Sequence, residues 1–244
     1  MICTVCLNPA RDKTVRVHEL RAGELNRVTV ESVKLGGKAV NVAETIRRLG
    51  GEVREVTAPV TRTNLKIIDS LGRLTEINEA GTYSPVEIPE GYGIYALCGS
   101  LPPDCGKAMY RDLTRKLRAQ GATVLVDADG EALRLALEAP PDIMKPNLRE
   151  LTELGMTPEQ LIGRGVKLVV VSMGADGARF VAKDTDFHVP AEKIAGVFSP
   201  VGAGDALVGA LCYALDTGLT LEEAAKLAIK AASDKIRRSI VCQP

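Results

Sequence analysis

Aromatic residues and histidines are scarce in this chain of 244 residues. Tryptophan is absent, and aromatics make up 3% of the sequence. Surfaces that stack the bases of single-stranded nucleic acid depend on aromatic rings, so this composition argues against such a binder. The two histidines, His18 and His188, lie in no recognisable motif, so a zinc hydrolase and a histidine-based triad both lack support. An apolar share of 45% still indicates an ordinary globular protein with an aliphatic core.

The sequence also lacks an excess of either charge and any long apolar run. Lysine and arginine number 31, as do aspartate and glutamate, whereas a nucleic-acid binder usually has a basic excess. No apolar run approaches the roughly 20 residues that a membrane-spanning helix needs. The first residues show neither the basic nor the apolar region of a signal peptide. We therefore expect a cytoplasmic protein that binds neither nucleic acid nor membranes.

Six cysteines are scattered along the chain, and two of them, Cys3 and Cys6, form a C-x-x-C. The segment 2–7 is typical of a β-strand, on which residues three apart point to opposite faces. No second pair lies nearby to complete a zinc site. We therefore expect reduced and mostly buried thiols.

Two kinds of pattern divide the chain at about Ile94. Before it, short β-like runs are separated by turn residues, and one helix is predicted from about Ala39 to Leu49. After it, apolar strands alternate with helices, which implies a parallel sheet covered on both faces. The sequence thus predicts a single α/β domain over 1–244, with a small β-sheet lid whose strands lie mainly within 1–35 and 60–80.

The later elements can be placed more closely from their periodicity and end signals. A helix is expected at about 107–120 and another after the Gly202–Gly204 turn, to about 216. A β-hairpin is expected from "GARFVA" with "DFHVP", residues 177–182 and 186–190. A last helix is expected to begin at Thr220, because Thr220 and Glu223 match a capping box.

Polar residues follow the predicted strands where each strand ends. In an open parallel sheet, ligands bind beyond the carboxyl ends of the strands. The residues at these ends are Gly99 and Ser100, Asp127 and Asp129, Lys145 and Asn147, and Ser172 and Gly174. We expect them to converge at one edge of the sheet.

The stretch "VGAGDA" places Asp205 directly after Gly202 and Gly204, where a helix begins. Helix N-termini expose N–H groups and positive dipole potential, and glycines let a phosphate approach the backbone. Aspartate is also a favoured residue for capping a helix. The motif alone leaves two interpretations of Asp205 equally open, a cap and a catalytic base.

Two further stretches contain residues suited to binding sugars or phosphates. "GGKAVN" joins Gly36, Gly37, Lys38 and Asn41 at a helix start, yet it lacks the ending of a P-loop and also fits a flexible turn before a core helix. "TRTN" supplies Arg62, whose guanidinium suits bidentate phosphate contact, although a single arginine is more often solvated.

"KPNLRE" brings together Lys145, Asn147 and Glu150. Asn147 and Glu150 are three residues apart and share one face of a first helical turn. Their oxygens suit a hydrated Mg²⁺ ion, which keeps several waters. The same spacing also fits a capping arrangement.

Taken in order along nearly the whole chain, the motifs resemble those of the ribokinase-like (PfkB) carbohydrate kinases. They are "TVCLNPARDKT", "NRVTVESVKLGGKAVNVAETIRRLG", "TRTNLKI", "CGSLPPD", "KPNLREL", "VVVSMGADGARFV" and "SPVGAGDALVGA". The likeness is greatest to the 1-phosphofructokinase branch, with tagatose-6-phosphate kinases next. It implies a three-layer α/β fold with a β lid, ATP and Mg²⁺ as cofactors, and transfer of a phosphoryl group to a sugar phosphate.

The resemblance also implies a role for each matching residue. Asp205 resembles the catalytic base, and the turn of Gly202, Ala203 and Gly204 resembles the anion hole. The sugar-binding set is Asp12, Gly36, Gly37 and Asn41, and the contacts to the substrate's own phosphate are Lys38 and Arg62. The nucleotide-binding set is Lys145, Asn147, Ser172, Gly174 and Gly177. Glu150, with Asn147, resembles the group that organises Mg²⁺ through water.

The sequence departs from this family in two ways. Ala39 stands where a third glycine is usual. The chain is also shortened, because only Glu52 to Val60 separate the first helix from "TRTN", where relatives carry a further strand, helix and strand. Two functions follow as alternatives to a fructose 1-phosphate kinase: a kinase of tagatose 6-phosphate or fructose 6-phosphate, and a non-catalytic protein that binds sugar phosphate or nucleotide. The exposed edges of the lid also suggest pairing with a second copy.

Overall fold

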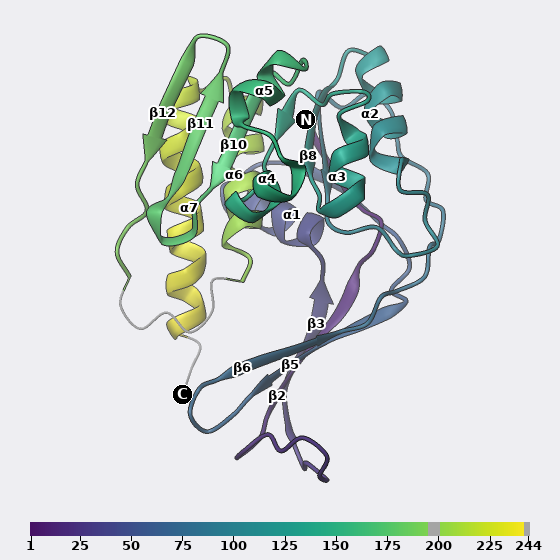
Figure 1. Ribbon diagram of the computed structural model, residues 1–244, viewed down its shortest axis with the longest axis vertical. Helices are drawn as coiled ribbons and strands as arrows, with labels where there is room; N and C mark the ends of the chain where they lie inside the picture. The colour runs from purple at the N-terminus through teal and green to yellow at the C-terminus, as the bar shows by residue number, and fades with distance from the viewer. Residues whose placement is uncertain (195–200, 242–244) are drawn as a thin grey trace.

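A computed structural model describes residues 1–194 and 201–241 and divides them between a layered α/β body and a small sheet that projects from it (Figure 1). Within the described residues, the large sheet has the strand order β12-β11-β10-β9-β8-β7-β1-β4. Its strands are β1 (Ile2–Cys6), β4 (Val53–Thr57), β7 (Ile94–Cys98), β8 (Thr123–Asp127), β9 (Ile143–Met144), β10 (Leu168–Ser172), β11 (Ala178–Ala182) and β12 (Thr185–Val189).

Most of this sheet is parallel, as the continuous apolar runs predict. β4, β1, β7, β8, β9 and β10 pair in parallel, and the β11–β12 hairpin closes one edge with antiparallel pairing. Strands such as β1 and β7 are buried along their whole length, because helices cover both faces of the sheet.

The helices form a layer on each face. One layer contains α1 (Lys38–Arg48), α6 (Ala203–Asp216) and α7 (Leu221–Val241), whose apolar side chains join one core cluster. The other contains α2 (Met109–Ala119), α3 (Gly130–Ala136), α4 (Leu148–Leu154) and α5 (Pro158–Gly163), which contribute to a second cluster. The predicted three-layer arrangement is therefore confirmed. Within the described residues, no helix is both long and apolar enough to span a membrane.

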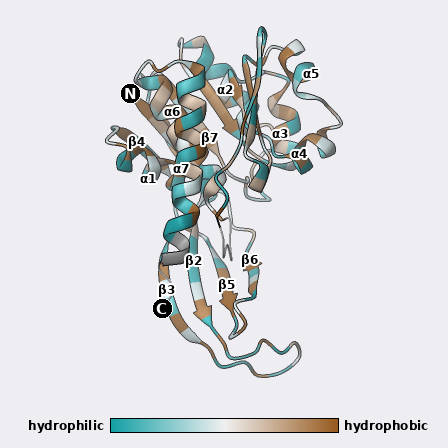
Figure 2. Cartoon of the chain, turned by 90° about the vertical axis from the view of Figure 1, so that its left-hand side faces the viewer, coloured by the Kyte–Doolittle hydropathy of each residue, from teal (hydrophilic) through white to brown (hydrophobic). Residues whose placement is uncertain are grey.

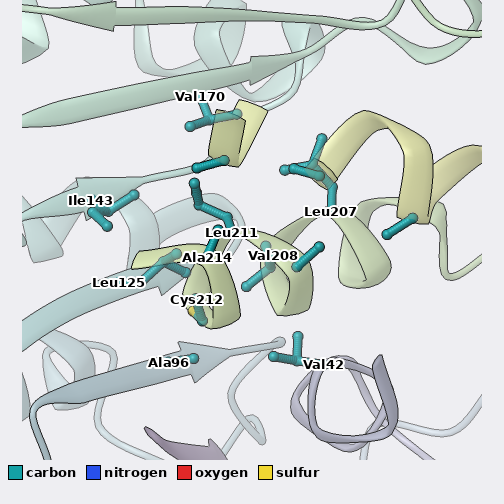
Figure 3. Close-up of a cluster of buried hydrophobic side chains, with 14 of the residues drawn as sticks. Val42, Ala96, Leu125, Ile143, Val170, Leu207, Val208, Leu211, Cys212 and Ala214 are labelled. Atoms are coloured by element: carbon teal, nitrogen blue, oxygen red, sulfur yellow. The ribbon is translucent and has the colours of Figure 1, made fainter. Parts of the chain in front are cut away.

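Helix α6 lies at the centre of the first core cluster (Figure 3). Leu211 and Val208 are fully buried there, together with Val42 of α1. Gly209 allows α1 and α6 to approach closely, because a Cβ atom at this position would lie 2.7 Å from the carbonyl oxygen of Val42. This contact fixes the start of α1 relative to the start of α6, and both ends contribute to the site described below.

The C-x-x-C of β1 is split between the two core clusters, as the strand periodicity predicts. Cys6 lies in the cluster with α6, and Cys3 lies in the other. Both thiols are free and buried, and burial raises the pKa of each to about 11. Cys242 lies outside the described residues.

The small sheet is the predicted lid, with strand order β3-β2-β5-β6. Its strands are β2 (Ala10–Arg16), β3 (Thr29–Gly36), β5 (Arg62–Ile68) and β6 (Leu74–Asn78). These strands lie mainly within 1–35 and 60–80, but not all of 1–35 belongs to the small sheet, because β1 pairs with β4 and β7 in the large sheet. Apart from Thr4 its sequence is apolar, which suits a strand buried on both faces better than a strand of a half-exposed lid.

The two faces of the lid differ in polarity, and Figure 2 shows hydrophobic and hydrophilic segments alternating along its strands. The register places Val33 and Leu65 on either side of Lys13, and Ile77 next to Leu65, so these apolar residues share one face. Val33 and Ile77 are 54% and 56% exposed. On the other face, Asp12 has polar residues as its register partners.

Candidate active site

Asp205 lies in the first turn of α6, at the start of the motif "GDALVGA". Gly202 is the N-cap of the helix, with a left-handed φ of 81°, and its neighbour Ala203 begins the helix. Oδ2 of Asp205 accepts a hydrogen bond of 2.7 Å from Nδ2 of Asn41 on α1. Among the described residues the N-cap is thus Gly202, and the carboxyl group of Asp205 is bonded to Asn41. Ser199 and Pro200, which precede this turn, lie outside the described residues.

The carboxyl group of Asp205 has an unusual protonation equilibrium. Burial raises its pKa to about 6, and the negative charge of Asp127 acts in the same direction. The hydrogen bond from Asn41 and the charges of Lys38 and Lys145 oppose this rise. A carboxyl group with a pKa near 6 is mostly ionised at neutral pH and is still basic enough to accept a proton.

Asp127, at the end of β8, connects two lysines near Asp205. Its Oδ1 lies 3.0 Å from Nζ of Lys38 and 3.2 Å from Nζ of Lys145. Lys145 is almost fully buried, and its Nζ lies 3.7 Å from where a Cβ atom on Gly204 would be. The sequence marked Asp127 as one of several polar strand ends but did not single it out.

Asp12 on β2 holds the polar face of the lid together. Its Oδ1 accepts a hydrogen bond of 2.9 Å from Nδ2 of Asn64, and its Oδ2 accepts one of 3.3 Å from Nζ of Lys66. Gly36 leaves the space that this carboxyl group occupies, because a Cβ atom at Gly36 would overlap it. Gly37 has a φ of 133°, and a Cβ atom there would lie 2.7 Å from Sγ of Cys6. Asn64 and Lys66 are polar partners of Asp12 that the sequence did not assign to a site.

The guanidinium group of Arg62 lies where the lid joins the body. It donates to the carbonyl oxygen of Asn8 at 2.9 and 3.2 Å, to the carbonyl oxygen of Glu79 at 3.3 Å and to Oδ1 of Asn64 at 3.1 Å. In this structure, Arg62 therefore links three segments of the chain through its hydrogen bonds.

The strand ends of β9 and β10 bring together most of the predicted nucleotide-binding residues. Asn147 and Ser172 form a parallel β-bridge, and Gly177 accepts a backbone hydrogen bond of 2.8 Å from Met173. Asn147 and Glu150 form a complete capping box for α4, with two hydrogen bonds of 2.8 Å. Lys145 lies apart from this group, beside Asp127.

A cavity of about 330 Å³ lies between the lid and the body, on the side of Asn41 and Gly202. This volume is at the lower end of the range of small-molecule pockets. Its lining residues are Asp12, Lys34, Asn41, Glu44, Arg48, Lys66, Val201, Gly202, Lys235 and Arg238. The cavity thus combines the predicted sugar-binding residues Asp12 and Asn41 with cations from four elements, β3, α1, β5 and α7.

Comparison with known proteins identifies the family. Residues 61–243 match the model of the pfkB family carbohydrate kinases, and the chain belongs to this family. A relative from Rhodobacter capsulatus, a 1-phosphofructokinase, is 38% identical, and the alignment covers 93% of this chain and 87% of that protein. That alignment extends over 279 residues, more than the 244 of this chain, so the relative contains segments that this chain lacks.

Solved structures support the same assignment. The phosphofructokinase-2 of Escherichia coli, in complex with fructose 6-phosphate, superposes with a TM-score of 0.85 at 27% identity, over 97% of this chain and 94% of that one. A ribokinase from Thermotoga maritima has a TM-score of 0.74 at 21% identity, over 97% and 92% of the two chains. The predicted ribokinase-like fold is therefore confirmed.

Proposed function

We propose that this protein is an ATP-dependent sugar-phosphate kinase that converts fructose 1-phosphate to fructose 1,6-bisphosphate. The family and the names of its relatives support the reaction class and the fructose-phosphate acceptor. The observation that carries the proposal is the position of Asp205, a buried carboxyl group with a pKa of about 6 at a glycine-rich helix start.

In this proposal Asp205 is the general base. It takes the proton from the sugar hydroxyl as that oxygen attacks the γ-phosphorus of ATP, and ADP leaves. Its hydrogen bond with Asn41 orients the carboxyl group. The N–H groups of the turn formed by Gly202, Ala203 and Gly204 stabilise the charge that develops on the transferred phosphoryl group. Phosphoryl transfer depends mainly on such positioning and charge stabilisation.

The substrate sites are proposed on either side of this turn. Asp12, Gly36, Gly37 and Asn41 are assigned to the sugar, and Lys38 and Arg62 are the residues that the family pattern assigns to the substrate's phosphate. The nucleotide is assigned to the strand ends that carry Lys145, Asn147, Ser172, Gly174 and Gly177. Their position at the carboxyl edge of a mostly parallel sheet supports this division.

The polar residues at this edge fit a hydrated Mg²⁺ ion. Oδ2 of Asp127 is buried and has no hydrogen-bond partner within the described residues, and such an oxygen is readily satisfied by a hydrated cation. No group of three or more metal-ligating side chains converges within the described residues, which favours binding through water. Glu150 and Asn147 are proposed to hold that shell. When bound, the ion supplies charge neutralisation to the ATP phosphates.

We also propose a homodimer that forms through the lid, in a cytoplasmic protein. The exposed apolar face of the lid, with Val33 and Ile77, supports the association. The buried, free thiols of the five described cysteines are typical of a reducing compartment, which supports the location.

An ADP-release assay with MgATP tests the proposed function. We expect turnover with fructose 1-phosphate to exceed turnover with fructose 6-phosphate and with tagatose 6-phosphate. Faster turnover with either of the other two sugar phosphates would assign a different acceptor. Absence of ADP release with all three, combined with a higher melting temperature in MgATP or sugar phosphate, would instead indicate a non-catalytic binding protein.

A further inference from the structure

The turn between β10 and β11, residues 173–177, contains two of the predicted nucleotide-binding residues, Gly174 and Gly177. It is built on a single turn of 3-10 helix, Gly174–Asp176. The N–H of Met173 donates to the carbonyl oxygen of Gly177 at 2.8 Å, and the N–H of Gly177 donates to that of Gly174 at 3.2 Å. These bonds give the turn its shape, but its position relative to the sheet depends on its neighbours.

On the side of β9, backbone contacts hold the beginning of the turn. Ser172, the last residue of β10, donates its N–H to the carbonyl oxygen of Pro146 at 3.0 Å and forms a parallel bridge with Asn147. Pro146 and Asn147 belong to the "KPN" stretch, so this contact joins two parts of the predicted nucleotide site. The end of the turn, at Asp176 and Gly177, has β12 as its neighbour instead.

The backbone of Gly177 lies directly against the end of β12. Its φ is 93°, and a Cβ atom there would lie 2.1 Å from the carbonyl oxygen of Val189 and 2.6 Å from the backbone nitrogen of Ala191. Glycine is therefore required here by both the left-handed backbone and the close approach. The position of β12 thus limits where the end of the turn can lie.

His188 on β12 adds a side-chain hydrogen bond to this contact. Its Nε2 lies 2.5 Å from the carbonyl oxygen of Asp176. A carbonyl oxygen can only accept, so Nε2 carries the proton and donates it. The carbonyl of Asp176 and the N–H of Gly177 belong to one planar peptide group. His188 therefore fixes the orientation of that group, which the permissive backbone of Gly177 would otherwise leave free to rotate.

The strand that carries His188 is itself held on both faces of the hairpin, which closes one edge of the large sheet (Figure 1). On the face of His188, Arg179 of β11 pairs with Asp186 of β12 and with Glu159 of α5, at 2.6 Å each. On the opposite face, the rings of Phe180 and Phe187 stack with centroids 5.5 Å apart. His188 therefore donates to the turn from a well-supported strand.

We propose that His188 is a positioning residue for ATP. Its hydrogen bond to Asp176 holds the turn of residues 173–177 where the backbone at Gly174 and Gly177 meets the nucleotide. This inference rests on the proposed function, which assigns the turn to ATP. Asp12 and Asn41, the predicted sugar residues, line the cavity between the lid and the body, whereas His188 contacts the turn that follows β10. Loss of the hydrogen bond should therefore affect ATP and spare the sugar phosphate.

Two substitutions of His188 test the proposal, because its side chain is exposed and its replacement leaves the core intact. His188→Leu removes the donor, whereas His188→Gln keeps an N–H group at about the same reach. Calorimetry with MgATP measures nucleotide affinity, and ADP release with fructose 1-phosphate measures KM and kcat. We expect His188→Leu to weaken ATP binding about three- to tenfold, as for loss of one hydrogen bond, with the KM for fructose 1-phosphate and kcat within twofold of the parent. His188→Gln should restore the affinity of the parent.

Asp186→Asn is the matched control. Asp186 lies on the same strand and the same face as His188, but it pairs with Arg179 and so supports the hairpin rather than the turn. We expect this variant to bind ATP like the parent. Weaker ATP binding in Asp186→Asn by as much as in His188→Leu would assign the effect to a looser hairpin and overturn the proposal. Equal losses in His188→Gln and His188→Leu would equally overturn it, because the donor would then have no role.

The proposal and the proposed function can fail separately. Unchanged ATP affinity in His188→Leu would overturn the positioning role, while the kinase function still stands if the parent releases ADP. A folded parent that neither binds MgATP nor releases ADP with fructose 1-phosphate would contradict both.

Discussion

The carboxyl group of Asp205 is subject to opposing influences. Burial and the nearby charge of Asp127 favour its neutral form, whereas Asn41, Lys38 and Lys145 favour the carboxylate. The balance places its pKa at about 6, close to the pH at which a general base works well. The supporting residues are therefore as important to the proposed chemistry as Asp205 itself.

This balance predicts the pH dependence of turnover. A general base works only as the carboxylate, so kcat/KM for the sugar phosphate should rise with pH through a midpoint of about 6 and level off above it. Asn41→Ala removes a hydrogen bond that lowers the pKa of Asp205, so the midpoint should move to higher pH. ADP release measured from pH 5 to 8 gives both midpoints. A midpoint that stays in place, or moves to lower pH, would contradict this role of Asn41.

The substitution Gly204→Ala tests whether the start of α6 takes part in catalysis without disturbing the fold. The φ of Gly204 is not left-handed, and an added Cβ atom would meet Nζ of Lys145 at 3.7 Å, an ordinary contact. Gly204→Ala should therefore keep or raise the melting temperature, because alanine favours helix. Its methyl group should displace the phosphoryl group from the backbone N–H groups and lower kcat about 10²-fold. Parent-like turnover would exclude this part of the turn as an anion hole.

The sequence could predict Asp205 but could not decide between a cap and a base. What the carboxyl group contacts depends on Asn41, which donates a hydrogen bond to it from 164 residues away in the sequence. Asp127 was marked only as one of several polar strand ends, because it lies in no motif and its partners Lys38 and Lys145 meet it only once the sheet has formed. The spacing of residues within one segment does not predict hydrogen bonds or ion pairs between side chains of different helices and strands.

At the scale of elements, the contact between α1 and α6 holds Asn41 against Asp205. Gly209 is the point of closest approach, where an added Cβ atom would lie 2.7 Å from the carbonyl oxygen of Val42 and 2.8 Å from Cβ of Thr45. Both neighbours belong to α1, so any side chain at Gly209 forces the two helices apart. Stability and site geometry are therefore coupled at this residue.

Gly209→Ala tests this coupling. We expect the free energy of unfolding to fall by about 1–3 kcal/mol through overpacking. We also expect kcat to fall, because Asn41 moves with α1. Gly163→Ala is the control, since Gly163 is also a helical glycine, at the end of α5, but has open space around it. Denaturant unfolding and ADP release measure both quantities, and equal values in the two variants would contradict the coupling.

Element positions could be predicted more closely than element partners. The expected helix at 107–120 corresponds to Met109–Ala119, and the predicted hairpin corresponds to β11 and β12. Periodicity and capping residues are local signals, so they place helices well. The apolar sequence of β1 indicates a strand buried on both faces, but no local signal names its partners β4 and β7.

At the scale of the whole molecule, the two faces of the lid carry different kinds of residue. Its polar face carries Asp12, Lys34 and Lys66 to the cavity, and its opposite face exposes Val33 and Ile77. The shortened connection leads from β4 to β5 through Ala58 to Thr61. The chain keeps the elements that carry the proposed site, although it lacks segments that its relative from Rhodobacter capsulatus contains.

The exposed face of the lid predicts the oligomeric state. Val33→Asp places a carboxylate beside Lys13 on this face and removes an apolar side chain from it, so it should convert the proposed dimer to a monomer by reducing the apolar area that the interface buries. Ser32→Asp adds the same charge to the opposite face of the same strand and should leave the dimer intact. Sedimentation velocity distinguishes the two masses. A parent that sediments as a monomer, or two variants that behave alike, would contradict dimerisation through this face.

The central claim is that Asp205 is the base of a fructose 1-phosphate kinase, and the kcat of Asp205→Asn with MgATP tests it most directly. The amide keeps the shape of the side chain but cannot accept the proton. We predict that the variant folds like the parent and binds fructose 1-phosphate, while kcat falls roughly 10²–10⁴-fold, as expected for loss of a general base. Equal rates of ADP release in the parent and in Asp205→Asn would contradict the claim.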